Sequence, residues 1–367
     1  MAEGIVSKMR TSRIIIVILV VAVIVVAAIY ALTALTAAPP VCTSAWDCAA
    51  GYPVQVGGTL AIAGEQCLST TSSIYCIGGQ DANGGPRNEV YYTSSISSSG
   101  NITGWALDPN SYPQYINGES CVLYSGFVYC VGGSYNDNGD DVASSYYAGV
   151  TASGSPGNWS STTAFPIPVD SQSCVASFSF IYCVGGVNET DGSNADATPT
   201  SSVWYAPLSS SGIGKWNPTT AYPANIYFPS CFVAASDIYC LGGADTNGNS
   251  LGTAYYATLS SSGVGAWTTT SSYPVAGSGQ ACVIYSGDVL CVGGETSDGT
   301  SPGYTNAVYY APISSGGIGA WKQSQSYPIS IGTTCVPLSA DIYCVGGFGS
   351  SAETNIVEYA SFASLMG

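Results

Sequence analysis

The cysteines are the residues whose spacing most clearly indicates a chemistry. Twelve of the 14 cysteines form six pairs with eight residues between the two members, and Gly-Gly follows each pair closely. The six pairs are Cys67/Cys76, Cys121/Cys130, Cys174/Cys183, Cys231/Cys240, Cys282/Cys291 and Cys335/Cys344. Such pairs could bind a metal, carry electrons or form disulfides. Because the chain has no histidine and no Cys-x-x-Cys motif, we predict six structural disulfides.

The spacing of eight residues fits a β-hairpin. A two-residue turn at 125–126 would pair Tyr124 with Phe127 and, counting outward, Cys121 with Cys130. The two cysteines would then occupy a non-hydrogen-bonded position, where Cα atoms lie about 4.5 Å apart. That separation lies within the range a disulfide spans. Each bridge would stabilise its hairpin by roughly 2.5–3 kcal/mol in the chain-entropy model.

Two cysteines, Cys42 and Cys48, stand outside the repeated pattern. A straight strand would hold them about 20 Å apart. If they pair with each other, the chain must therefore loop around Trp46. The alternative is an intermolecular bond.

Acidic residues gather in the loops that follow each Gly-Gly. They are Asp81, Asp137, Asp140, Asp141, Glu189, Asp191, Asp245, Glu295 and Asp298. We expect a negative rim that binds a cation, a glycan or a protein, unless these residues only shape solvated turns. The oxygen-rich run 136–141, with Asp137, Asp140 and Asp141, is a calcium candidate, although it lacks the full EF-hand pattern. No other metal or cofactor is expected.

The lack of histidine and of basic residues limits the chemistry further. Without histidine there is no Ser-His-Asp triad and no imidazole metal ligand. After residue 13 the basic residues are Arg87, Lys215 and Lys322 alone, and the net charge is -16, so nucleic-acid binding is excluded. A two-carboxylate glycoside hydrolase stays open as an alternative. We expect a binding protein rather than an enzyme.

Three Asn-x-Ser/Thr sequons occur, at Asn101, Asn158 and Asn188. They are candidate glycosylation sites if the chain meets a glycosylation machinery. The alternative is that they arise by chance in a sequence rich in serine and threonine.

The cysteine pairs belong to a longer repeat of 51 to 57 residues. In each unit an apolar strand ends at Gly-Gly, a polar loop and an aromatic strand follow, and a Ser/Gly turn leads to Trp. An aromatic-Pro pair then comes six to eight residues after the Trp. Four short strands separated by turns make one antiparallel propeller blade. The soluble part is therefore predicted to be all-β.

The Trp elements fix how the ring closes. They begin at Trp46, Trp105, Trp159, Trp216, Trp267 and Trp321. The first precedes every cysteine hairpin, and no Trp element follows the last hairpin. We therefore predict that the N-terminal strand completes the last blade, which removes the exposed sheet edges.

The unit resembles the kelch repeat of the galactose-oxidase/kelch propeller superfamily over residues 46–367. The resemblance rests on the Ile-Tyr-Cys-Leu-Gly-Gly run at 238–243 and its equivalents, on the aromatic after the loop, and on the later Trp. It implies a six-bladed β-propeller. Propellers of this type include both binding modules and enzymes, and galactose-oxidase copper chemistry would need two histidines that are absent.

The N-terminal segment predicts a membrane anchor. Residues 14–32 form an unbroken apolar run of 19 residues, and three basic residues precede it. The positive-inside rule then predicts a cytoplasmic tail at 1–13, a transmembrane helix at 14–35, a linker at 36–45 and an extracellular propeller at 46–367. A cleaved signal peptide ending near Ala37 is the alternative.

These observations lead to an expected function. We expect a cell-surface recognition or adhesion module that presents a propeller face to a protein or glycan. The alternatives are an extracellular carbohydrate-active hydrolase or lyase, and a structural component of the envelope.

Overall fold

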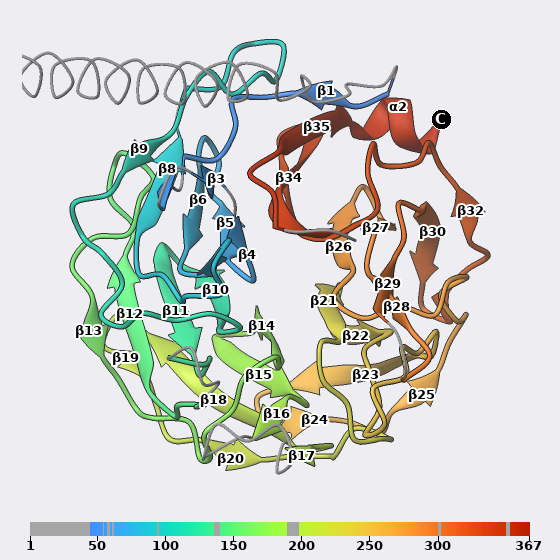
Figure 1. Cartoon of the computed structure of the whole chain (residues 1–367). Coiled ribbons are helices and arrows are strands. Elements are labelled where there is room, and N and C mark those ends of the chain that lie inside the picture. The colour runs from blue at the N-terminus through green and yellow to red at the C-terminus, as the bar shows by residue number, and fades with distance from the viewer. Residues whose placement is uncertain are drawn as a thin grey trace, which may run out of the picture. The chain divides into compact units, whose positions relative to one another are not determined.

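The computed structural model describes residues 45–367 except 54, 57–58, 61, 94, 136–139, 189–197, 300–301 and 350–352. The chain divides into two units, Met1–Val41 and Cys42–Gly367, and every described residue belongs to the second. In that unit six antiparallel sheets surround a central axis (Figure 1). The second unit is thus a six-bladed, all-β propeller, as the repeat predicted.

Each blade has four strands, of which the first lies innermost. Blades 1 to 3 are β5 (Gln66–Ser69), β6 (Ile74–Ile77), β8 (Val90–Thr93), β9 (Ala106–Leu107); β10 (Ser120–Tyr124), β11 (Phe127–Val131), β12 (Ser145–Gly149), β13 (Ser160–Ser161); and β14 (Ser173–Ser177), β15 (Phe180–Val184), β18 (Val203–Ser209), β20 (Asn217–Pro218). Blades 4 to 6 are β21 (Ser230–Ala234), β22 (Asp237–Leu241), β23 (Ala254–Ser260), β25 (Thr268–Thr269); β26 (Ala281–Tyr285), β27 (Asp288–Val292), β30 (Val308–Ser314), β32 (Lys322–Gln323); and β33 (Ile331–Leu338), β34 (Asp341–Gly349), β35 (Val357–Ser361), β1 (Asp47–Cys48).

Several short strands and one short helix lie outside the four-stranded sheets of the blades. Two-residue strands β19 (Gly212–Ile213), β24 (Gly263–Val264) and β31 (Gly317–Ile318) extend the third strands of blades 3 to 5. Four small ladders are β2 (Gln55–Val56) with β3 (Thr59–Leu60), β4 (Ile62–Ala63) with β7 (Gln80–Asp81), β16 (Val187–Asn188) with β17 (Thr198–Pro199), and β28 (Glu295–Ser297) with β29 (Pro302–Tyr304). One short helix, α2 (Phe362–Met366), follows the last strand.

The two ends of the propeller meet in blade 6. Strand β1 pairs antiparallel with β35, with Asp47 opposite Tyr359 and Cys48 opposite Glu358. Figure 1 shows β1, from the start of the described chain, lying along β35 near its end. The predicted closure is therefore confirmed. We call this pairing of β1 with β35 the seam.

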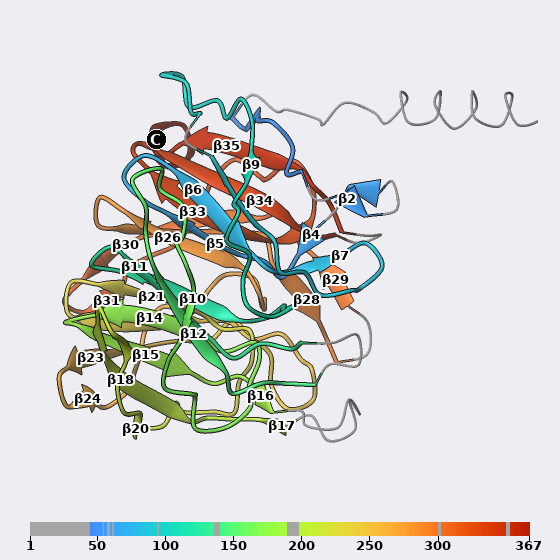
Figure 2. The ribbon, with the colours of Figure 1, turned by 90° about the vertical axis from the view of Figure 1, so that its left-hand side faces the viewer.

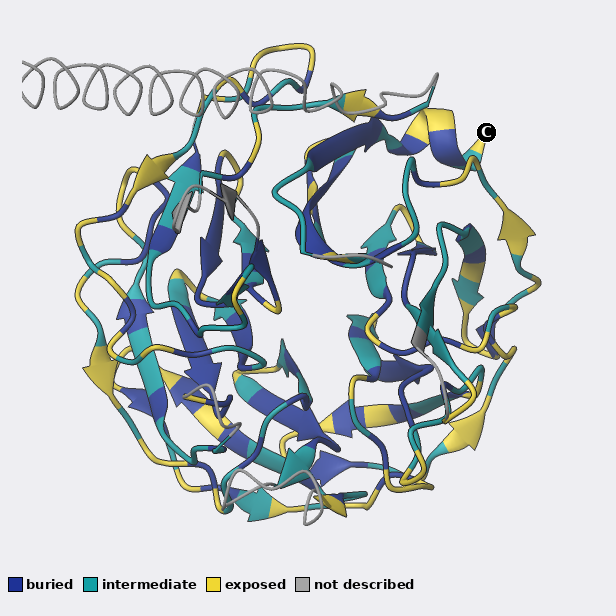
Figure 3. Ribbon diagram, viewed as in Figure 1, coloured by how far each residue is buried: buried dark blue, intermediate teal, exposed yellow. Residues whose placement is uncertain are grey.

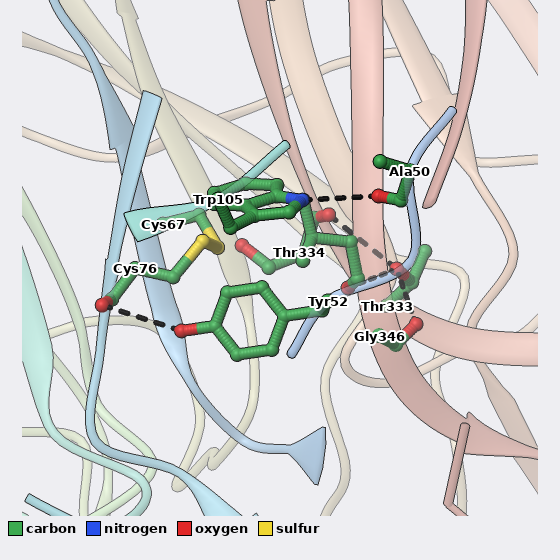
Figure 4. The surroundings of a disulfide bond; sticks show 9 residues. Ala50, Tyr52, Cys67, Cys76, Trp105, Thr333, Thr334 and Gly346 are labelled. Atoms are coloured by element: carbon green, nitrogen blue, oxygen red, sulfur yellow. Dashed lines mark hydrogen bonds between the residues drawn. A yellow bond between two sulfur atoms is a disulfide. The ribbon is translucent and has the colours of Figure 1, made fainter. Parts of the chain in front are cut away.

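Each Trp of the repeat packs edge-on against the aromatic residue of the aromatic-Pro pair in the preceding blade. The ring centroids lie 4.8 to 5.2 Å apart in Tyr52–Trp105, Tyr112–Trp159, Phe165–Trp216, Tyr222–Trp267, Tyr273–Trp321 and Trp46–Tyr327. In the first five pairs the indole N–H also donates to a backbone carbonyl, as Trp105 does to Ala50 at 3.0 Å (Figure 4). Trp46 completes the circle at the seam, so these six contacts join all the blades.

The second strands form the core between blades. Four consecutive residues are buried in each of them, for example the Ile-Tyr-Cys-Val run of β15, because neighbouring blades cover both faces. Each fully buried Ile, Val or Leu side chain contributes about 1.5–3 kcal/mol. Exposed residues lie instead on outer strands such as β9, β13 and β32 (Figure 3).

All six predicted hairpin disulfides are present. They are Cys67–Cys76, Cys121–Cys130, Cys174–Cys183, Cys231–Cys240, Cys282–Cys291 and Cys335–Cys344. The register in blade 2 is the one counted from the sequence, with Cys121 opposite Cys130 and Tyr124 opposite Phe127. The paired Cα atoms lie 4.0 to 4.1 Å apart, somewhat closer than the 4.5 Å of an average non-hydrogen-bonded pair.

Of the two cysteines outside the repeat, only Cys48 lies among the described residues. Cys48 is disulfide-bonded. Its predicted partner, Cys42, lies outside the described residues.

The predicted single-pass membrane topology needs correction. Across the described part of the chain, no helix is long and apolar enough to cross a membrane. A transmembrane helix with an extracellular propeller behind it is therefore unsupported. The segment 14–35, on which that prediction rested, lies outside the described residues.

Candidate ligand-binding site at the mouth of the central channel

A cavity of about 490 Å³ opens at one mouth of the central channel. All six innermost strands begin there, and the first cysteine of every hairpin lies in its wall. Two sets of segments frame the mouth, the loops after Gly-Gly and the residues just before each first cysteine. Their short strands β4, β7, β16, β28 and β29 gather on one side of the propeller, at the right in Figure 2. We call this side the loop face.

The two cysteines of a hairpin lie in different places: the first lines the cavity and the second does not. The second cysteine of every pair lies on the second strand, in the core between blades, and is at most 1% exposed. None of these six lines the cavity; they are Cys76, Cys130, Cys183, Cys240, Cys291 and Cys344. They are therefore structural residues and do not belong to a ligand site, whereas their partners anchor the channel wall.

The repeated Gly-Gly is what directs the chain onto the loop face. Both glycines have positive φ in every blade, for example +66° at Gly132 and +101° at Gly133. A Cβ on Gly133 would lie 2.8 Å from the carbonyl oxygen of Asn117 in the preceding segment. The bend thus needs residues without a side chain, because L-residues rarely adopt this conformation and the space is filled.

Backbone hydrogen bonds run from blade to blade around the mouth. The residue three positions before the first cysteine donates its N–H to the carbonyl of the same position in the preceding blade. The chain of bonds is Gly118 to Gly64 (3.3 Å), Ser171 to Gly118 (3.0 Å), Phe228 to Ser171 (2.8 Å) and Gly279 to Phe228 (3.0 Å). These bonds satisfy the rim backbone, which makes the mouth a preformed site.

Phe228 is strained at this rim. Its φ is +50°, at a position where Gly64, Gly118 and Gly279 have φ between +60° and +68° and Ser171 has φ +54°. A left-handed backbone at a bulky residue costs about 1–3 kcal/mol and usually marks a functional constraint. The Phe228 ring packs on Tyr227, with the centroids 5.5 Å apart, but Phe228 stays 43% exposed, so its burial does little to offset this cost. The aromatic ring is therefore a candidate contact for a ligand.

A second exposed aromatic lines the same cavity. Phe348, 38% exposed, packs on Tyr304 with the ring centroids 5.6 Å apart. Burial, helped by the nearby carboxylates Glu295 and Glu353, raises the pKa of Tyr304 to about 12. The Tyr304 hydroxyl thus stays a hydrogen-bond donor at any ordinary pH.

The other polar groups in the wall are neutral or acidic. Asn117, Gln80, Asp170 and Glu295 line the cavity together with the buried Glu65 and Glu119, and burial raises the pKa of Glu295. No Lys or Arg is found among the described residues that line it. The site therefore combines exposed aromatic faces with acceptors and a few donors, and it lacks a group that would attract an anion.

The predicted acidic loop residues are distributed unevenly. Glu295 is the one described member of that set that lines the cavity. Asp81 is buried, lies 3.5 Å from the Arg87 guanidinium and accepts the backbone N–H of Asn83. Asp245 accepts the backbone N–H groups of residues 247 and 249 and the amide of Asn249, which lowers the pKa of its carboxyl. Asp81 and Asp245 thus organise their own loops.

The remaining members lie away from the cavity or outside the described residues. Asp141 is buried, and Asp298 is exposed beside its bridge partner Asn249. Asp140 is half-buried. Asp137, Glu189 and Asp191 fall outside the described residues. Because Asp137 belongs to it, the calcium candidate stays a prediction.

The sequons are placed differently from one another. Asn158 is exposed, while Asn101 is half-buried with its side-chain oxygen enclosed. Asn188 donates its amide to the carbonyl of Pro168. Glycosylation stays a prediction at all three.

Several residues of the site were not singled out from the sequence, namely Phe228, Phe348, Tyr304, Asn117 and Asp170. Most of them come from the segment just before the first cysteine. If the six repeats are aligned on their first cysteine, Phe228 stands at a position where most repeats have glycine. That alignment is the signal from which Phe228 could have been found.

Comparisons with known proteins support the fold but give no family. No family model matches the chain, and no curated protein matches it in sequence. The solved structures with a similar fold include one titled "Structure of YjhT", with a TM-score of 0.66 and 12% identity. The match covers 84% of this chain and 95% of that one. At this identity the likeness shows a shared propeller fold alone, and the kelch assignment stays a prediction.

Proposed function

We propose that this protein is a recognition module that binds an uncharged or amino-sugar-containing glycan at the mouth of its central channel. A disulfide-rich six-bladed propeller is consistent with an extracellular binding or enzymatic module. The observation that carries the proposal is Phe228, an exposed aromatic held in a strained backbone conformation at the rim. The kelch-like repeat supports the same kind of module.

The chemistry of the wall favours a sugar. Pyranose rings present apolar C–H faces that pack on aromatic rings, and their hydroxyl groups pair with carbonyl, amide and carboxylate groups such as those of Asn117 and Glu295. A cavity of about 490 Å³ is in the range of sites for small ligands. The net charge of -16 and the lack of Lys or Arg among the described lining residues disfavour polyanionic ligands.

The test compares two variants of the full chain on a panel of cello-, manno-, chito- and glucosamine oligosaccharides, with heparin and polyuronates as anionic controls. Phe228→Gly removes the ring and relieves the backbone, so it should abolish glycan binding without loss of stability. Phe178→Gly is the matched control, because Phe178 also has positive φ (+50°) and is 51% exposed, but lies at a hairpin tip away from the cavity. Selective binding to anionic glycans, or equal losses in the two variants, would refute the proposal. So would capture of a protein with no oligosaccharide bound.

Hydrolysis of a glycan is the second candidate, because four carboxylic residues line the same cavity: Glu65, Glu119, Asp170 and Glu295. Glu295 has a raised pKa, as a general acid needs, and Asp170 lies in the same wall. Release of reducing sugar from any bound oligosaccharide would favour this function, provided that Glu295→Gln stops the release and keeps the binding.

A further inference from the structure

Hydrogen bonds from buried side-chain amides join neighbouring blades at the channel wall. Two positions before the first cysteine, Gln172 of blade 3 and Gln280 of blade 5 point into the junction with the preceding blade. Their side-chain N–H groups donate to the carbonyls of Val131 (2.7 Å) and Leu241 (2.9 Å). Each acceptor is the residue directly after the second cysteine of that preceding blade.

Glutamates occupy the same position in blades 1 and 2. A Cβ on Gly132 would lie 2.9 Å from Gln172 Nε2, and a Cβ on Gly78 would lie 2.8 Å from Glu119 Oε1. A Cβ on Gly346 would lie 2.6 Å from Glu65 Oε1. In all three junctions the side-chain tip therefore reaches the first glycine of the preceding Gly-Gly.

An ionised carboxylate would be unfavourable in this position. Glu65 and Glu119 are only 2% and 1% exposed. No other described residue donates a hydrogen bond to either oxygen of Glu119 or to Oε1 of Glu65, and neither glutamate takes part in an ion pair between described residues. The glutamines show that the junction offers a carbonyl acceptor, and an ionised carboxylate would repel that carbonyl oxygen. At the Glu65 junction the corresponding carbonyl, that of Val345, also accepts from Thr333 Oγ1 at 2.9 Å.

We propose that Glu65 and Glu119 are neutral carboxylic acids that donate their O–H groups to the carbonyls of Val345 and Ile77, as Gln172 and Gln280 donate their amides. The two glutamates flank blade 1 at the channel wall, at its junctions with blade 6 and with blade 2. These two junctions are therefore held together in acid and loosen in alkali. Both glutamates also line the cavity, but their contacts join neighbouring blades whether or not a glycan binds there.

The titration behaviour agrees with this geometry. Burial raises the pKa of Glu65 and of Glu119 from 4.5 to about 8, although a hydrogen bond from the residue's own backbone N–H lowers it in part. For Glu119 the neighbouring Glu65 adds to the rise in pKa. The other titratable group facing both is Tyr52, and Tyr112 faces Glu119. Burial raises the pKa of both tyrosines well above its ordinary value, so they stay neutral.

The nearby charged groups do not stabilise the ionised form of the two glutamates. Beyond Tyr52 lie Tyr91 and Glu89, and Arg87 is paired with Glu89 and with Asp81. Since the folded pKa lies above the unfolded one, the contribution of each glutamate to stability is complete below about pH 4.5. It is then lost as the pH rises to about 8.

The test is denaturant unfolding of the full, disulfide-bonded chain between about pH 5 and 9. The folding equilibrium constant of the wild type should fall by up to about tenfold per pH unit for each glutamate within this window. Glu65→Gln/Glu119→Gln should stay stable at pH 5 and lose most of this fall, whereas the half-buried control Glu353→Gln should keep it. Gln172→Glu should steepen the fall. Parallel wild-type and double-variant profiles, or a double variant already destabilised at pH 5, would overturn the proposal.

An infrared measurement keeps the proposal testable if a variant does not fold. The native wild type at about pH 6 should show the C=O band of buried protonated carboxyl groups, and the band should persist in deuterated buffer. It should shrink in the Glu65→Gln or Glu119→Gln single variants. A wild-type spectrum without this band would overturn the proposal.

Discussion

Trp46→Ala should weaken the propeller at its seam more than an equivalent change elsewhere in the ring. Trp46 is fully buried, packs on Tyr327 with the centroids 4.9 Å apart, and shares a core cluster with Phe362 and Leu365 of α2. Burial of about 200 Å² at 25 cal/mol per Å² is worth about 5 kcal/mol. Measured Trp-to-Ala losses in protein cores are about 3–5 kcal/mol.

The assay is guanidinium unfolding of the full oxidised chain, with Trp267→Ala as the matched control. Trp267 makes the same edge-on contact, with Tyr222 at 5.0 Å, but is only partly buried and lies in blade 4, away from the seam. We expect it to lose about 2 kcal/mol or less. Limited proteolysis of Trp46→Ala should cut first in blade 6. Equal losses in the two variants, or first cuts in another blade, would refute the account of closure.

Three further predictions concern the disulfides, a buried carboxyl at the seam and a loop aspartate. Cys121→Ser/Cys130→Ser should lower the free energy of unfolding by about 2.5–3 kcal/mol. It should also speed hydrogen exchange mainly in β10 and β11. Uniform acceleration of exchange in all blades would contradict a local role of this disulfide. Burial, reinforced by Asp47, raises the pKa of Glu358 to about 7. Glu358→Gln should therefore reduce the loss of thermal stability that accompanies a rise in pH from about 4.5 to 7. An unchanged pH profile would count against a buried neutral Glu358. Asp245→Ala removes a turn acceptor outside the cavity, so it should cost about 1 kcal/mol and leave glycan binding unchanged in a titration.

The sequence allowed the hairpins and the closure to be predicted because both depend on local counting. The register of a hairpin follows from its turn, so Cys121 had to face Cys130 once the turn was placed at 125–126. The closure followed because the number of Trp elements matches the number of hairpins only if the first one joins the last blade.

The site was harder to predict because it depends on contacts between blades. The burial of Glu119 has meaning only beside the Gly78 backbone of another blade, and the strain at Phe228 is invisible until its φ is known. Local chemistry also misled the interpretation of the acidic loops. Asp81 looked like part of a binding rim, but Arg87 and the backbone of its own turn occupy it.

Hydrogen–deuterium exchange of the full chain, with and without the oligosaccharide that binds best, tests the glycan site most directly. The account predicts protection in the rim segments 63–66, 117–120, 170–173, 228–230 and 278–281, and none at the hairpin tips on the opposite face. Protection at those tips instead, or no oligosaccharide that binds at all, would contradict it.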